Sequence, residues 1–506
     1  MPVKTATHAR RALVAVLAAA AGLAAFAVGA PAATGSPIAG NMRMAIDSSP
    51  NFSNLSLTAQ RHRFVILQAW QTQRLEQLKA SNPEIKVLVY KNLSASIASS
   101  NGGLHSTGVS HQEADGEHPE WFLKNTSGQR FTFSSYSYLW AMDVGSASYQ
   151  SRWADNVVAE LEQNGWDGVF VDDTNTTMKY HYPVAQIAKY PSDSAWQQAT
   201  ASALAHIGPR VRAAGKVAIP NIGSWGENPT VGRNWLQYVD GAMDEMFTKW
   251  GDSAGSGYAW DGHWERQLAS LKYAQQQGKE FLAISHSANG DAAAARYGWA
   301  TVLLGASGHA SFALHDDYTN ENWFSFYEQQ IGEPTGASTK LASGVHRRTF
   351  SGGVVVVNPT DSTRTAQLGG TYSGAGRTDV SSIQLAANRA AILTGVSASA
   401  TDDPPRTSIK PGKKRIKGGK VVAKGRVDGA ATLAGAGSRV QPRIQLRRAG
   451  NVHRTVRAQL RSGNRFVGRA DVCRAGRYRV VAIDPESGER TPWPGQLKVR
   501  PAQLRC

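Results

Sequence analysis

The stretch "GWDGVFVDDTN" (165–175) places two adjacent aspartates at the end of a short apolar run. The run is rich in β-branched and aromatic residues, which predicts a buried strand. Side chains alternate along a strand, so Phe170 and Asp172 share one face while Val171 and Asp173 share the other. A strand of this kind that ends in carboxylates raises the question of what lies opposite them.

Seven further runs resemble this one, and amphipathic segments separate them. The eight predicted strands are 42–47, 64–70, 86–92, 168–173, 217–223, 241–247, 281–287 and 309–317. Helical spacing of apolar residues is clear in 149–164 and 198–214, on either side of the fourth strand. Alternating strands and helices over about 290 residues predict an α/β fold, a (β/α)₈ TIM barrel. A ninth run, 138–144, we assign to a long insertion after the third strand.

The composition and periodicity of the sequence change after the predicted barrel, which we place at 34–335. Short alternating runs and Gly-rich turns predict a small β-sandwich over 336–400. A Pro-rich, charged segment at 401–418 predicts a basic linker. Residues 419–506 alternate apolar side chains with Arg or Lys and predict a basic, immunoglobulin-like all-β module.

The first residues are typical of a secretory signal peptide, which we place at 1–33. Arg10 and Arg11 precede an apolar stretch, 12–30, and the small-residue site "APAAT" follows. An uncleaved anchor is the alternative, and the two arginines also fit twin-arginine export. No later stretch has the length and apolarity of a membrane span. We therefore expect a secreted, extracellular protein with no transmembrane segment in its mature form.

The two cysteines, Cys473 and Cys506, both fall near the end of the chain. In an exported protein they are able to pair, so we expect a disulfide that restrains the carboxyl terminus. Two free thiols are the alternative.

The net charge of +17 belongs to the end of the chain. Residues 401–506 carry 25 Lys and Arg against 7 Asp and Glu, a net +18, whereas the preceding residues sum to −1. For an exported protein, such a segment favours an anionic cell-wall polymer or lipid headgroups over nucleic acid, and the protein would then be cell-wall associated. A solvated surface without a partner is the alternative.

In a barrel of this class the active site lies at the carboxyl ends of the strands. Asp172 then points into the barrel mouth. Alternation on the sixth strand groups Met243, Glu245 and Phe247, which puts Glu245 at the mouth and turns Asp244 outward or toward a loop. Strands four and six lie two apart in the ring, so their ends converge. Two such carboxyls, with pKa values set apart by their surroundings, are what cleavage of a glycosidic bond requires.

Other polar and aromatic residues at predicted strand ends are candidates for substrate binding. They are Asp47, Tyr90, Lys91, Trp140, Asp173, Asn221, Trp250, His286 and Asp316. Lys91 would orient or acidify a carboxylate, Asn221 would bond a sugar hydroxyl, and flat rings would stack on pyranose faces. Asp173 would cap the next segment or hold a neighbour. The alternative for each is a cap, a loop anchor or core packing.

Two other chemistries have weaker support in the sequence than glycoside hydrolysis. "GDSAG" (251–255) matches the nucleophile-elbow pattern and would make Ser253 the nucleophile of a serine esterase, but a helix does not follow at once. The histidines show no metal-binding spacing, and no phosphate loop or dinucleotide motif is present, so we expect no metal or cofactor. A barrel that binds glycan or cell wall without catalysis stays open as another class.

Several blocks resemble a known family. "VLVYKNLSAS", "HPEWFLKNTSGQR", "GWDGVFVDDTN", "YVDGAMDEMF" and "VVVVNPT" are similar, in order, to the glycosyl-hydrolase-like family fifteen of secreted bacterial proteins, over roughly 42–394. The fourth- and sixth-strand blocks also look like the endo-alpha-1,4-polygalactosaminidase family, with an Asp after the fourth strand and a Glu after the sixth. This resemblance implies a hydrolase of α-linked polysaccharide with Asp172 as nucleophile and Glu245 as acid/base.

Overall fold

The computed structural model describes residues 38–47, 49–182, 187–251, 253, 255–259, 261–395, 408–417, 420–428, 443–448, 451–461, 465–483 and 490–504. The chain divides into two compact units, 1–396 and 397–506. The predicted signal peptide (1–33) and Cys506 lie outside the described residues, so the signal peptide and the Cys473–Cys506 disulfide stay predictions.

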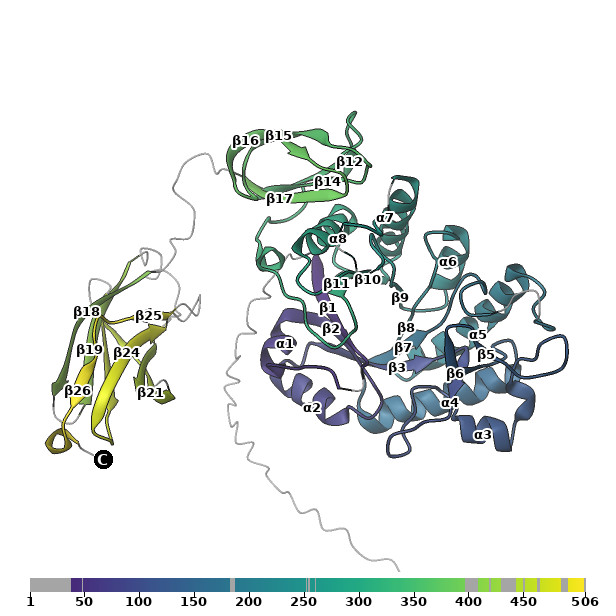
Figure 1. Ribbon diagram of the computed structural model, residues 1–506, viewed down its shortest axis with the longest axis horizontal. Helices are drawn as coiled ribbons and strands as arrows, with labels where there is room; N and C mark the ends of the chain where they lie inside the picture. Colours follow the sequence, from purple (N-terminus) through teal and green to yellow (C-terminus); the bar gives the residue numbers. More distant parts are fainter. Residues whose placement is uncertain are drawn as a thin grey trace, which may run out of the picture. The chain divides into compact units, whose positions relative to one another are not determined.

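The first unit is built around eight parallel strands, in the order β8-β7-β3-β2-β1-β11-β10-β9 (Figure 1). They are β1 (Ala39–Ala45), β2 (His62–Leu67), β3 (Lys86–Asn92), β7 (Gly168–Asp172), β8 (Val217–Pro220), β9 (Gly241–Asp244), β10 (Glu280–His286) and β11 (Ala310–His315). The two end strands, β8 and β9, are linked by a single bridge between Asn221 and Met243, so the ring is nearly closed. The predicted barrel and its eight strands are confirmed.

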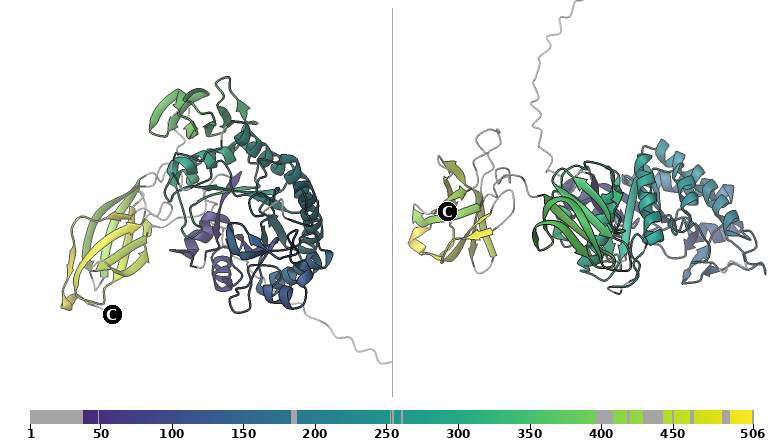
Figure 2. Two further views of the ribbon diagram at one scale, coloured as in Figure 1. Left: turned by 45° about the vertical axis from the view of Figure 1, so that its right-hand side comes forward. Right: turned by 90° about the horizontal axis from the view of Figure 1, so that it is seen from above.

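Helices surround the strands on the outside of the ring (Figure 2). They are α1 (Leu55–Arg61), α2 (Thr72–Ser81), α3 (His111–Gly116), α4 (Ala147–Asn164), α5 (Asp193–Ala213), α6 (Pro229–Leu236), α7 (Asp261–Gln276) and α8 (Ala292–Gly305). In α4 the Ser146 side chain caps the first turn. The helix ends at Gly165, whose φ of 75° suits glycine and turns the chain into β7.

Alternation along the strands separates two cores. Phe170 and Met243 point into the barrel interior, whereas Val169, Val171 and Ala242 pack against the helix layer. The next inward positions at the carboxyl ends of β7 and β9 therefore belong to Asp172 and Glu245. The strand pattern stops at Asp244, however, so Phe247 does not share the face of Glu245 as predicted. It is buried in the outer core against Phe281.

The insertion after β3 forms a small antiparallel sheet of its own. Its strands are β4 (Ala95–Ile97), β5 (Thr132–Phe133) and β6 (Tyr136–Ala141). β6 holds most of the predicted ninth run, which lies in the insertion as expected. The insertion returns to α4 and so stands beside the carboxyl ends of β3 and β7.

A six-stranded sheet, ordered β12-β13-β14-β17-β15-β16, follows the barrel. Its strands are β12 (Thr339–Lys340), β13 (His346–Phe350), β14 (Gly353–Asn358), β15 (Arg364–Gly374), β16 (Arg377–Leu385) and β17 (Arg389–Gly395). Val354 and Val356 of β14 face the core of this sheet, while Val355 and Val357 join the barrel core next to α8. Burial on both faces explains the unbroken valine run. A two-sheet sandwich stays a prediction, because the strands follow one sheet path.

The second unit contains two antiparallel sheets that enclose one apolar core. Its strands are β18 (Ser408–Lys417), β19 (Lys420–Asp428), β20 (Arg443–Arg448), β21 (Asn451–Arg457), β22 (Gln459–Arg461), β23 (Arg465–Asp471), β24 (Gly476–Ile483), β25 (Arg490–Pro492) and β26 (Leu497–Val499). The segment predicted as a linker thus contains a strand from Ser408 onward. The immunoglobulin-like class stays a prediction. Within the described residues of both units, no helix has the length and apolarity needed to cross a bilayer.

Candidate active site

Three strand ends bring Asp172, Asn221 and Glu245 together at the barrel mouth. The Asn221 Nδ2 group donates to Oδ1 of Asp172 at 2.9 Å and to Oε2 of Glu245 at 2.6 Å. Oδ1 of Asp172 and Oε2 of Glu245 therefore lie no more than about 5.5 Å apart. The predicted convergence of the two acids is observed, and Asn221 is the residue that couples them.

Asp172 is held by a second donor from the neighbouring strand. The Tyr90 hydroxyl donates to Oδ2 of Asp172 at 2.6 Å, and burial raises the pKa of Tyr90 well above its usual value, so it keeps its proton. Burial, reinforced by the charges of Asp173 and Glu245, raises the pKa of Asp172 to about 7. The unliganded site therefore favours a proton on Asp172 in neutral and acidic solution.

Glu245 has a different set of neighbours. Its Oε1 accepts from the Tyr318 hydroxyl and lies 3.7 Å from Nε2 of His286. Tyr318 and His286 also bond each other at 2.7 Å, and the Trp250 ring lies 4.2 Å from the His286 ring. Burial alone would raise the pKa of Glu245, but His286, Tyr318 and Asn221 outweigh it and the pKa is lowered. The two carboxyls thus have pKa values set apart by their surroundings, as acid–base chemistry needs.

Asp173 holds the adjacent loops in place and lies on the opposite face of the strand from Asp172. It has a left-handed backbone (φ 57°), accepts from Asn92 and lies 3.1 Å from Nε2 of His181. The His181 ring stacks on Phe133 of the insertion. A non-glycine residue with positive φ is strained and persists where its surroundings fix it. Asp173 therefore ties the insertion to the end of β7, as its predicted corner position suggested.

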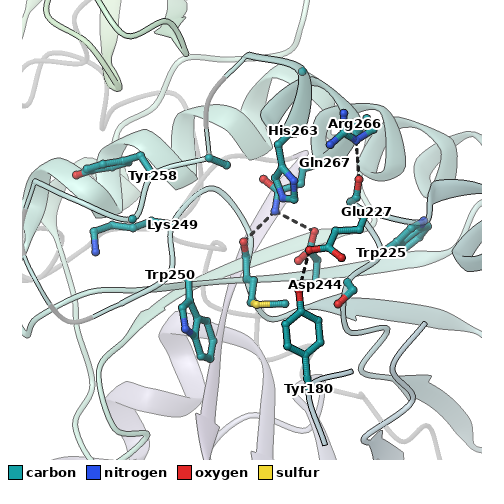
Figure 3. Close-up of a pocket in the computed structure, with 16 residues that line it drawn as sticks. Tyr180, Trp225, Glu227, Asp244, Lys249, Trp250, Tyr258, His263, Arg266 and Gln267 are labelled. Atoms are coloured by element: carbon teal, nitrogen blue, oxygen red, sulfur yellow. Dashed lines mark hydrogen bonds between the residues drawn. The ribbon is translucent and has the colours of Figure 1, made fainter. Parts of the chain in front are cut away.

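A pocket of about 620 Å³ opens on the helix side of β9, where Asp244, Met246 and Trp250 line it and Glu245 does not. Figure 3 shows Trp250 and Tyr180 at its edge, with the Tyr180 hydroxyl directed toward Glu227 and with Gln267 on the side of α7. The Tyr180 hydroxyl donates to Glu227 at 2.7 Å. Asp244 lines the pocket from the helix side, where Gln267 of α7 donates to it, and burial raises the pKa of Asp244 to about 7. The outward direction predicted for Asp244 is observed.

The role predicted for Lys91 at the barrel mouth is wrong. Its side chain is 1% exposed, and its ammonium group lies 2.6 Å from Glu160 of α4, on the helix side of β3. It does not reach a carboxylate at the mouth, because the adjacent Tyr90 already faces the mouth and alternation sends Lys91 the other way.

Three other predicted residues make their contacts with groups other than the carboxylate pair. Asp47 accepts from the backbone of Ser49, and Asp316 accepts from the backbone of Asp317, so each carboxylate supports its own turn. Trp140 is half-buried within the insertion and packs beside His111. None of these contacts leads to Asp172 or Glu245.

Two residues that contact the acids of the mouth were not predicted from the sequence. Tyr318, which follows β11, has a φ of 62° that directs the loop back over the mouth toward Glu245. His181, in the loop after β7, pairs with Asp173. The signal in the sequence that points to Tyr318 is a tyrosine that follows a strand end directly.

The serine-esterase alternative does not fit the surroundings of Ser253. Ser253 is exposed in a loop that follows β9 by several residues, and α7 begins only at Asp261. A nucleophile elbow needs a strand that turns directly into a helix, so Ser253 lacks that setting. Within the described ranges, no group of three or more His, Cys, Asp or Glu side chains could hold a metal ion.

A family model for the hypothetical glycosyl hydrolase family 15 matches residues 79–354, more than half of the chain. The chain belongs to this family. The match includes β7 and β9 with both carboxylates and, together with the barrel fold, supports a glycosidase-type function for this family member. No curated protein matches the chain in sequence.

Solved structures similar to this family 15 chain are distant. The glycoside hydrolase domain of PelA from Pseudomonas aeruginosa is 14% identical, with a TM-score of 0.38, and the match covers 55% of this chain and 95% of that one. A noncanonic maltogenic alpha-amylase, AmyB from Thermotoga neapolitana, is 12% identical, with a TM-score of 0.39 and coverage of 71% and 98%. An alpha-amylase from Geobacillus thermoleovorans complexed with acarbose is 10% identical, with a TM-score of 0.37 and coverage of 71% and 99%. At these identities no substrate is indicated.

Proposed function

We propose that the protein is a secreted retaining glycoside hydrolase that cleaves an α-linked polysaccharide with Asp172 and Glu245. The observation that carries the proposal is the Asn221 amide shared by the two carboxylates, which limits their nearest oxygens to about 5.5 Å. The carboxyl groups of an inverting pair are about 6.5–9.5 Å apart, which admits a water molecule between the general base and the sugar. The α-linkage comes from the resemblance to the polygalactosaminidase family.

In this mechanism the carboxylate of Asp172 attacks the anomeric carbon and forms a glycosyl ester, while the bond to the leaving oxygen breaks. Glu245 gives its proton to that oxygen. Glu245 then takes a proton from water, whose oxygen attacks the anomeric carbon and releases Asp172. Asn221 and Tyr90 position Asp172, and Tyr318 and His286 position Glu245.

The proton must therefore lie on Glu245 when the sugar is bound, although the unliganded site favours Asp172. The two sites are linked, because the charge of Glu245 is one cause of the raised pKa of Asp172. A sugar that displaces water from Glu245 favours its neutral form, and once Glu245 is neutral Asp172 ionises more readily. The donors Tyr90 and Asn221 then stabilise the Asp172 carboxylate.

The test is to incubate purified protein with a panel of polysaccharides and to measure new reducing ends. The panel contains α-1,4-polygalactosamine with and without acetyl groups, amylose, dextran, chitosan and chitin. We expect reducing ends from at least one member, and their loss in Asp172→Asn and Glu245→Gln. A protein that binds a glycan without catalysis would release none, and both variants would bind as the wild type does.

We also propose that the second unit binds an anionic cell-wall polymer after export. Residues 401–506 carry a net +18, and the binding of such a surface to polyanions weakens with salt. Deleting the chain from Thr401 onward should abolish salt-sensitive adsorption to cell walls and leave hydrolysis of soluble glycan unchanged. Unchanged adsorption would instead favour a solvated surface without a partner.

A further inference from the structure

The Tyr318 hydroxyl lies between Glu245 and His286 and bonds both of them. Its oxygen lies next to Oε1 of Glu245 and 2.7 Å from Nε2 of His286. Nε2 of His286 is 3.7 Å from the same Oε1, which is too far for a direct hydrogen bond. The hydroxyl is therefore the bridge between the imidazole and the carboxyl group.

The number of hydrogens fixes the direction of these two bonds. A tyrosine hydroxyl carries one hydrogen, and an ionised carboxylate only accepts. Burial raises the pKa of Tyr318 well above its usual value, so the hydroxyl keeps its hydrogen. When Glu245 is ionised, Tyr318 must donate to Oε1 and accept from Nε2–H of His286. When Glu245 carries a proton on Oε1, both bonds reverse, and Nε2 of His286 must then lack its hydrogen.

The other groups around the His286 ring do not compete for its proton. The ring is buried, and the Trp250 ring covers it at 4.2 Å. Its neighbour on β11 is His315, whose Nε2 accepts a backbone N–H from β1 and whose pKa burial lowers well below its usual value. The Lys249 ammonium group donates to the backbone carbonyl of His286 at 3.2 Å. Glu245, reached through Tyr318, is therefore the base to which these contacts direct the His286 proton.

We propose that His286 stores the proton that Glu245 gives to the leaving oxygen, and that Tyr318 passes it on. In the unliganded site His286 is an imidazolium ion and Glu245 is a carboxylate. When a sugar binds, the Nε2–H bond breaks and that proton joins the Tyr318 oxygen. At the same time the O–H bond of Tyr318 breaks and its proton joins Oε1 of Glu245. One positive and one negative charge disappear together, and Tyr318 ends as it began.

Loss of water from the mouth favours this transfer. The Glu245 side chain is 23% exposed, so a bound sugar has water to displace from it. An ion pair that loses its water is destabilised relative to the neutral pair. The charge of Glu245 is also one cause of the raised pKa of Asp172, so its loss lets Asp172 ionise. Sugar binding thus prepares the acid and the nucleophile together. The inference rests on the proposed function and names the source of its proton.

The experiment compares two substrates of the full-length protein. One is the panel polysaccharide that the wild type cleaves, whose leaving oxygen needs a proton. The other is the 2,4-dinitrophenyl glycoside of the same sugar, whose leaving group needs none. His286→Gln keeps an amide donor for Tyr318 but has no proton to release. The control is His346→Gln, which removes a buried histidine of β13 that lies 3.4 Å from Glu265 of α7.

We expect His286→Gln to lower kcat/KM on the polysaccharide by about tenfold to a hundredfold, and on the dinitrophenyl glycoside by less than about threefold. Tyr318→Phe removes the bridge and leaves His286 in place, so it should give the same pattern. His346→Gln should match the wild type on both substrates. Because kcat/KM covers formation of the glycosyl ester and not its hydrolysis, the later role of Glu245 as a base does not enter the comparison.

A second measurement observes the His286 ring itself. Asp172→Asn protein with ¹⁵N-labelled histidine is studied by NMR with and without an oligosaccharide of the cleaved polysaccharide, which this variant should bind and not cleave. The His286 signals are those that His286→Gln lacks. At about pH 6 we expect a proton on both ring nitrogens in the free protein and no proton on Nε2 in the complex.

Three results would overturn the inference while leaving the proposed function intact. They are equal losses on the two substrates, no loss on the polysaccharide, and a His286 ring whose protonation is the same with and without the oligosaccharide. A wild type that releases no reducing ends from any glycan overturns the proposed function and the proton transfer together.

Discussion

The strand ends on the two sides of the barrel mouth are both rich in acids, yet their surroundings differ. On the side of β7, β8 and β9, Asp172 and Glu245 face each other and share Asn221. On the side of β1 and β11, Asp47 and Asp316 each accept a backbone N–H within their own turn. An acid whose hydrogen bonds are satisfied within its own turn supports a loop, whereas two acids that share one donor across the mouth are placed for chemistry.

The largest effect that separates the two sides is on catalysis. Asp172→Asn and Glu245→Gln should each lower kcat by about a thousandfold or more, because each removes a group that reacts. Asp47→Asn, on the other side, should change kcat by less than about twofold. Reducing-end release by the three variants under identical conditions measures this. A comparable loss in Asp47→Asn would show that both sides take part.

A smaller effect is expected at Tyr318. Tyr318→Phe removes a donor to Glu245, so the pKa of Glu245 should rise and the acid limb of the pH–rate profile should move to higher pH. We expect kcat to fall by about tenfold to a hundredfold, with little change in KM. The matched control is Tyr327→Phe, which removes a buried hydroxyl that has no hydrogen-bond partner among the described residues. An unmoved acid limb in Tyr318→Phe would contradict this role.

The raised pKa of Asp172 also predicts the alkaline limb. The pair needs one proton, and it loses that proton as the pH rises through about 7. kcat/KM, which reports the free enzyme, should therefore fall above about pH 7. A profile that stays flat to pH 9 would contradict the coupling between the carboxyls.

The same two acids should have opposite effects on stability. The folded protein holds the Asp172 proton more tightly than the unfolded chain, so this acid stabilises below about pH 4 and the benefit is lost as the pH rises toward 7. Asp172→Asn should therefore stabilise by about 2 kcal/mol at pH 8 and less at pH 4. The pKa of Glu245 is lowered, so Glu245→Gln should destabilise at pH 8. Thermal unfolding of both variants at the two pH values measures the contrast. Changes of the same sign in the free energy of unfolding at pH 8 would contradict it.

The smallest effect on activity is expected at Lys91. Lys91→Met leaves Glu160 without its partner and should lower the free energy of unfolding by about 3 kcal/mol. kcat should be unchanged, because Lys91 faces the helix layer. Denaturant unfolding and initial rates together test this. A lower kcat with an unchanged free energy of unfolding would instead indicate that Lys91 acts at the barrel mouth.

The inward direction of the two acids could be predicted from the sequence, because it depends only on alternation within each strand. Alternation along β7 and β9 fixes which side chains point inward, and the parallel ring brings their carboxyl ends together. The same rule, applied to β3, would have excluded Lys91, because Tyr90 and Lys91 are neighbours and face opposite ways. Tyr318 could not be predicted this way, since its direction depends on a left-handed loop residue and not on strand alternation.

The carboxyl-terminal unit shows a different limit of sequence patterns. The prolines and charges of 401–418 favoured a linker. In the structure the pairing of β18 with β19 shifts register between Pro411 and Lys414, so an irregularity in the ladder accommodates the proline. The pattern of residues does not reveal such a shift in advance.

The central claim is that Asp172 and Glu245 act as a retaining pair. It is tested most directly by reacting the protein with a 2-deoxy-2-fluoro glycoside of the sugar it cleaves and locating the covalent adduct by peptide mass spectrometry. We expect a glycosyl ester on Asp172. An absent adduct, together with product released in the inverted configuration, would contradict it.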